Sequence, residues 1–241
     1  MKQFILSISC MLTICGISFA QVDSKEVSIV NDSYSVVING DLPIATKIVN
    51  AKEWIAKTFG DYKSVLQFED ESSGKIIIKG KSGFKRERKN LPGGQYNLED
   101  HTATMNYTVT LDFKEDRFRI KFEDIAFDVL QETLIGTSLS KRNKQYSFEE
   151  YVQAVDWPTG SISALQEEVE ELKAKDESTM SKKDIKNHHE ELARKEESLM
   201  KKKNDVEWVE GIRMKRSNDV LFTIANFVNS LASSINTNDD F

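Results

Sequence analysis

The fold is decided by the stretch TMNYTVTLDFKEDRFRIKFE, residues 104–123. Apolar side chains alternate strictly with polar ones on both sides of a charged turn at Lys114-Glu115-Asp116. Successive side chains of a strand point to opposite faces, so this period of two gives one buried face and one wet face. The stretch therefore predicts two adjacent antiparallel strands with an apolar side facing a core.

The segment before this hairpin adds a strand and a helix. Residues 27–38 are rich in β-branched side chains and favour a strand with a kink at Asn31-Asp32. Asp41 is expected to cap a following helix that has Pro43 in its first turn. Apolar residues then recur every three or four positions up to the helix stop at Gly60, namely Ile44, Ile48, Ala51, Ile55 and Phe59, with Trp54 alongside.

A second hairpin follows this helix. Residues 65–71 and 75–81 favour strands and flank the turn Ser72-Ser73-Gly74. The predicted order is β-α-β-β-β-β, which is an α+β fold with an antiparallel sheet backed by helices. Residues 82–100 predict a long loop, with ragged strand ends as the alternative at its borders, and the strand pattern weakens after Ala126.

The sheet domain is assigned to residues 21–157. Near its end, Ser147 and Glu150 form a capping-box pattern for a helix that stops before Pro158.

A charged helical arm is predicted over residues 158–205. Residues 161–219 hold 13 Lys or Arg and 15 Asp or Glu and no Phe, Tyr or Pro, a composition that indicates solvated helices rather than a packed core. A first apolar seam comprises Ile162, Leu165, Val169 and Leu172; a second repeats every seven residues at Ile185, Leu192, Leu199 and Val206. The seams suit a helical hairpin or a weak partner-binding helix, and the sequence leaves one long helix open as well.

The last segment, residues 206–241, predicts an amphipathic helix. Its broad apolar stripe consists of Val220, Leu221, Ile224, Phe227, Val228, Leu231 and Ile235. Docking onto the sheet domain is the expected role. Contact between copies of the chain and binding to a membrane surface are the alternatives, although residues 217–235 lack the basic face that a membrane helix uses.

Residues 1–20 have the pattern of a secretory signal. Met1-Lys2 is followed by an apolar run from Phe4 to Phe19, and Ser18-Phe19-Ala20 predicts cleavage between Ala20 and Gln21. The alternatives are a retained anchor helix and a lipoprotein acylated at Cys10 or Cys15. We expect an exported protein, periplasmic or secreted, without cysteine or a transmembrane segment after cleavage.

Three stretches together resemble a known family. They are Ala51–Phe59, Val65–Asp70 and Gly74–Gly80, with residues 107–113 and 116–120 fitting a final hairpin. This pattern is similar to the exported bacterial family called "domain of unknown function 4468 with a TATA-box-binding-protein-like fold", over about residues 28–128. The resemblance implies an antiparallel sheet backed by helices, and it supplies no activity.

Motifs for common chemistries are incomplete. Gly80-Lys81-Ser82 lacks the earlier glycine of a phosphate-binding loop, and His188-His189-Glu190-Glu191 lacks the spacing of a zinc-binding helix. The acidic clusters Glu69-Asp70-Glu71, Glu115-Asp116 and Glu123-Asp124 could supply paired carboxylates, but two of them lie beside turns. We expect no enzyme, no cofactor and no metal. The net charge of -6 also disfavours nucleic acid as a partner.

One basic stripe is a candidate binding face. Arg117, Arg119 and Lys121 alternate with the apolar side chains of one predicted strand and therefore share its wet face. They could bind an anionic ligand or partner, or they could pair with acidic neighbours across the sheet.

The sequence thus favours an exported, non-enzymatic binding or interaction module that uses its helices to contact an unknown protein or a second copy of itself. The alternative is an exported small-ligand binder or enzyme acting on an anionic ligand at Arg117, Arg119 and Lys121.

Overall fold

The computed structural model describes residues 21–85, 102–135, 138–154 and 162–237. Its six-stranded antiparallel sheet has the order β1-β5-β4-β3-β2, and β6 pairs with β5 beside this path. The strands are β1 (Tyr34–Asn39), β2 (Leu66–Asp70), β3 (Lys75–Lys85), β4 (Thr102–Phe113), β5 (Arg117–Ile135) and β6 (Ser138–Ser147). The α+β class is confirmed, with one strand more than the sequence predicted.

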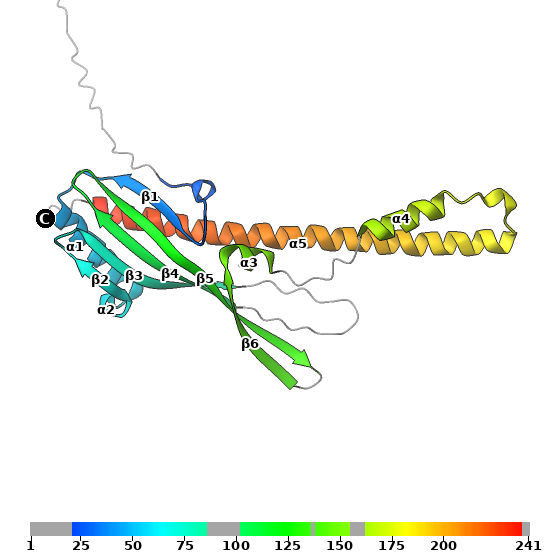
Figure 1. Ribbon diagram of the computed structural model, residues 1–241, viewed down its shortest axis with the longest axis horizontal. Coiled ribbons are helices and arrows are strands. Elements are labelled where there is room, and N and C mark those ends of the chain that lie inside the picture. The colour runs from blue at the N-terminus through cyan, green and yellow to red at the C-terminus, as the bar shows by residue number, and fades with distance from the viewer. Residues whose placement is uncertain (1–20, 86–101, 136–137, 155–161, 238–241) are drawn as a thin grey trace, which may run out of the picture.

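Helices back one face of this sheet. The α-helices are α1 (Ile44–Phe59), α2 (Tyr62–Val65), α3 (Phe148–Gln153), α4 (Ile162–Lys173) and α5 (Lys182–Asn236), with short 3₁₀ turns at Ser24–Glu26 and Glu177–Thr179. Figure 1 shows α1 and the C-terminal part of α5 against the strands, while the rest of α5 extends well beyond them with α4 folded back along it. The molecule therefore consists of a sheet domain and a projecting helical hairpin.

The alternating pattern of the central hairpin places the core as expected. Met105, Tyr107, Val109 and Leu111 of β4 are buried, as are Phe118, Ile120 and Phe122 of β5. Trp54 of α1 is buried against the same core. The predicted inner face of both strands is confirmed.

β5 continues past the point where its sequence pattern weakens, because a bulge reverses the alternation. The pairing with β4 shifts between Asn106 and Thr108, and Asp124 opposite adopts a positive φ of 54°. Buried residues are even-numbered before the bulge and odd-numbered after it, at Ile125, Phe127 and Val129. One inserted residue in a strand has this effect, since the period of two restarts out of phase.

Several predicted boundaries were wrong. β1 begins at Tyr34, because Asn31 and Asp32 adopt left-handed conformations that turn the chain ahead of it. Pro43, and not Asp41, is the N-cap residue of α1, which has no side-chain cap. β3 extends to Lys85, so the predicted loop 82–100 begins with strand residues. The remainder of that loop lies outside the described residues.

A buried lysine connects α1 to the turn of the central hairpin. The Nζ of Lys47 donates hydrogen bonds to the carbonyl oxygens of Lys114 and Glu115, both at 2.8 Å. Burial lowers the pKa of Lys47, against the opposing effect of the acidic side chains of Glu115, Asp116 and Asp41. The apolar spacing of this helix could not predict the contact, because the contact places a charged amine on the apolar side of the helix.

The arm is an antiparallel hairpin whose second helix does not stop at residue 205. The Ser181 hydroxyl accepts a hydrogen bond from the Asp184 N–H and caps α5, which then runs for 55 residues. At 1.5 Å per residue, α5 is about 80 Å long. A single helix therefore links the tip of the arm to the core of the sheet domain.

Candidate functional site

The basic stripe on β5 lies on the wet face of the sheet, where acidic neighbours neutralise it. The Nε and Nη2 of Arg119 donate to Asp112 Oδ2 on β4 at 3.0 and 2.6 Å. Lys75 of β3 approaches the same carboxylate at 3.5 Å. These contacts form a cross-strand ion-pair row of the kind that stabilises a sheet surface.

The other two residues of the stripe are also paired. Lys121 lies 2.5 Å from Glu123, whose second carboxylate oxygen accepts from the Thr110 hydroxyl at 2.9 Å. The hydrogen bond from Lys121 lowers the pKa of Glu123. Arg117 lies 3.8 Å from Asp116 at the turn. The three cations share one face, but no described contact directs them at a common point where an anion could bind.

The first acidic cluster is likewise engaged in structural contacts. Lys52 of α1 bridges Glu69 and Glu71, and the Tyr62 hydroxyl donates to Glu69 at 2.9 Å. The hydrogen bond from Lys52 lowers the pKa of Glu69, while burial raises the pKa of Tyr62.

Asp70 shapes the turn between β2 and β3. Its Oδ1 accepts from the hydroxyl and the N–H of Ser72 at 2.6 and 2.9 Å, and the hydroxyl contact contributes most to lowering its pKa to about 2. This carboxylate is therefore committed to holding the turn.

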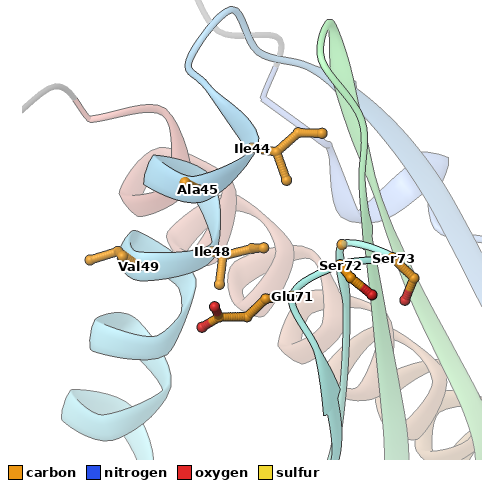
Figure 2. Close-up of a pocket in the computed structure, with 8 residues that line it drawn as sticks. Ile44, Ala45, Ile48, Val49, Glu71, Ser72 and Ser73 are labelled. Carbon is orange, nitrogen blue, oxygen red and sulfur yellow. The ribbon is translucent and has the colours of Figure 1, made fainter.

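A surface hollow of about 460 Å³ lies between the start of α1 and this turn. Figure 2 shows that Ile44, Ile48 and Val49 come from the helix and that Glu71, Ser72 and Ser73 come from the turn. The only ionisable side chain of its lining is Glu71, which pairs with Lys52. Lys52 engages Glu71 and Asp70 accepts from the Ser72 hydroxyl, and no described hydrogen bond joins Glu71 to either serine, so the described lining offers no activated nucleophile.

The described histidines lie together at the tip of the arm. The Nε2 of His189 is 2.7 Å from Glu177, and that of His188 is 3.9 Å from the same carboxylate. Within the described residues, no three His, Cys, Asp or Glu side chains gather closely enough to hold a metal ion. His101 and residues 1–20, where the signal is predicted and which include Ala20, lie outside the described part of the chain.

The arm is held by a narrow apolar seam and by ion pairs. Leu165, Val169 and Leu172 of α4 are buried against α5. Lys195 pairs with Glu168, and Lys173 lies 3.1 Å from Glu196. Most of the remaining side chains of both helices are exposed. The hairpin thus presents a long charged surface to solvent.

The other end of α5 is part of the sheet domain's core. Its buried residues there are Val220, Ile224, Ala225, Val228, Leu231, Ala232 and Ile235. The ring of Phe227 lies 4.8 Å from that of Trp54, 5.0 Å from Phe122 and 6.0 Å from Tyr107. The Trp54 indole also donates to the Ser230 hydroxyl at 2.9 Å. Helices α1 and α5 and the sheet therefore share one aromatic cluster.

The middle of α5 is tied to α3. The Nη1 of Arg216 donates to the carbonyl oxygens of Tyr151 and Ala154 at 3.1 and 2.9 Å, near the end of α3. Its guanidinium also lies 5.5 Å from the centre of the Tyr151 ring. These contacts lie where α5 leaves the sheet domain, and they fix the direction of the arm.

None of the described helices has the length and apolar content needed to cross a bilayer.

The sequence did not predict the contact of Lys47 with the hairpin turn, nor the hydrogen bonds between the Asn229 amide and the backbone of Val22. Single polar residues in apolar helices give no periodic signal that could have revealed either.

Comparison with known proteins finds similarity over part of the chain. A DUF4468 family protein from Bacteroides ovatus is 19% identical with a TM-score of 0.32, and the match covers 48% of this chain and 64% of that one. A TBP-like protein from Parabacteroides distasonis is 15% identical with a TM-score of 0.36, covering 57% and 80%. This chain thus spans less than two thirds of the first structure, and no curated protein matches it. The family resemblance is confirmed over residues 49–128, which match the family described as "Domain of unknown function (DUF4468) with TBP-like fold".

Proposed function

We propose that this protein is an exported, non-enzymatic interaction module in which the sheet domain anchors a projecting helical arm. The observation that carries the proposal is the division of α5. Its C-terminal part packs in the core around Phe227, while its N-terminal part extends past the sheet with α4 (Figure 1). A helical segment that stands outside the core yet continues directly into a core helix suits contact with another macromolecule.

The composition of the arm supports this role. A seam of three buried residues on α4 holds the hairpin closed, and the outer faces are charged. Met200, 67% exposed, is a large apolar side chain among these charges. A surface of this kind suits a reversible contact, because charged groups at an interface affect the association rate and the specificity for a partner more than the affinity.

Export is proposed from the signal pattern of residues 1–20, with the mature chain beginning at Gln21. The absence of an enzymatic role is proposed because the carboxylates described above are committed to ion pairs and turns. The alternative, an anionic ligand at Arg117, Arg119 and Lys121, has less support because each of these cations already has an acidic neighbour.

Site-specific photo-crosslinking in the exporting cell tests the proposal. A photo-reactive amino acid would replace Met200 on the arm in one variant. In the matched control it would replace Val37 of β1, which is 57% exposed and pairs in register with Arg119 on the wet face of the sheet. We expect a discrete adduct from position 200 and none from position 37. Adducts from position 37 alone would favour the alternative and refute the arm as the contact surface.

A further inference from the structure

The start of the described chain is fastened to α5 by one side chain. The Val22 N–H donates to Asn229 Oδ1, and Asn229 Nδ2 donates back to the Val22 carbonyl oxygen, both at 2.9 Å. Val27, a few residues later, is buried in the core. The backbone is thus held from Val22 onward, and Asn229 satisfies both hydrogen-bonding groups of that residue.

Gln21 lies immediately before the clamped residue and is exposed. It lines a surface hollow of about 370 Å³ together with Val22, Asp23 and Ser24 from its own segment and Phe222, Ala225, Asn226 and Asn229 from α5. Asp23 is the one ionisable side chain of this described lining, and its Oδ1 already accepts from the Lys25 N–H at 3.0 Å. The surroundings of Gln21 are therefore mostly neutral and partly apolar.

We propose that Gln21 is a modification site, converted to an N-terminal pyroglutamate once the signal is removed. The inference rests on the proposed export, because cleavage after Ala20 makes Gln21 the first residue. Its free α-amine then attacks the side-chain carboxamide carbon, a five-membered lactam forms, and ammonia leaves. Atoms and charge balance without an oxidant, a reductant or a second substrate.

The clamp permits this ring closure. The reaction uses the nitrogen of Gln21 and leaves the Val22 N–H and carbonyl, which Asn229 holds, untouched. Closure needs only rotation about bonds of Gln21 itself, whose side chain is exposed.

The surroundings accommodate the product. A lactam is neutral, and the hollow beside it is lined by the apolar side chains of Phe222 and Ala225 and the uncharged amides of Asn226 and Asn229. Cyclisation therefore yields an end that fits its hollow and is chemically blocked.

Intact-mass analysis and Edman sequencing of the exported protein test the proposal. We expect the mass of residues 21–241 less one ammonia molecule, with no signal in the first Edman cycle. The Gln21→Ala variant leaves Ser18-Phe19-Ala20 unchanged before the cut and cannot form the lactam, so it should show the full mass of its chain and sequence normally.

Failure of each step is distinguishable. A mature chain that starts at Gln21 and still has the full, uncyclised mass after long incubation would refute lactam formation and leave the proposal of export unaffected. An exported chain that starts elsewhere would overturn cleavage after Ala20 and, with it, the modification in the cell. In that case, full-length mature protein released from a cleavable tag with Gln21 first would still report whether the lactam forms, and an unchanged mass there would refute the chemistry as well.

Discussion

Replacing Phe227 by alanine should destabilise the sheet domain, because the ring joins α5 to both the sheet and α1. Truncating a buried Phe to Ala costs about 3–5 kcal/mol. Phe227 is only partly buried, so we expect the lower end, about 3 kcal/mol. Its ring contacts with Trp54, Phe122 and Tyr107 keep the cost from falling further, since aromatic pairs add about 0.5–1.5 kcal/mol beyond buried area.

Urea unfolding followed by tryptophan fluorescence measures this cost. With a denaturant dependence of about 2 kcal/mol per molar urea, the midpoint should fall by about 1.5 M. Phe222→Ala on the same helix is the matched control. Its side chain is 59% exposed, and we expect a change within about 0.5 kcal/mol. Equal midpoints for the two variants would refute the assignment of this part of α5 to the core.

Two further predictions concern the sheet. Gly80→Ala should destabilise the domain by about 1–3 kcal/mol through overpacking, because the added Cβ would clash with the Tyr107 ring. In the control Gly83→Ala on the same strand, the added Cβ meets nothing within 4 Å. Equal melting temperatures for the two variants would contradict this prediction. Asp70 has its pKa lowered to about 2 from an ordinary value of 3.8 by hydrogen bonds from Ser72 and Ser73. Its contribution to stability is therefore present above pH 3.8 and lost as the pH falls toward 2, so the melting temperature of Asp70→Asn should change less than that of wild type over this interval.

The sequence predicts the central hairpin well because β4 and the first part of β5 have one wet face and one buried face. It fails at Asp124, where one inserted residue reverses the phase of burial, and it therefore misses the rest of β5. β6 escapes for a different reason. Its sequence SLSKRNKQYS has almost no apolar alternation, and it pairs only with the distal part of β5.

The candidate site was only partly predictable. Alternation placed Arg117, Arg119 and Lys121 on one face correctly, but it could not reveal their partners, because Asp112 belongs to the neighbouring strand. The apolar spacing on α4 predicted the buried residues Leu165, Val169 and Leu172, whereas the seven-residue repeat at Ile185, Leu192, Leu199 and Val206 is only partly buried. The roles of Lys47 and Asn229 were not predictable, since each makes a specific polar contact with backbone distant in sequence.

The central claim is that the arm hairpin is dispensable for folding and that the C-terminal part of α5 is not. Two deletions compared by circular dichroism melting and light scattering test it most directly. Replacing residues 162–203 by a short Gly/Ser bridge removes α4 and the projecting part of α5, while removing residues 218–241 takes away the buried stripe from Val220 to Ile235. We predict that the first protein melts cooperatively near the wild-type temperature and stays dispersed, and that the second unfolds or aggregates. Loss of folding in the first, with a stable monomer in the second, would contradict the account.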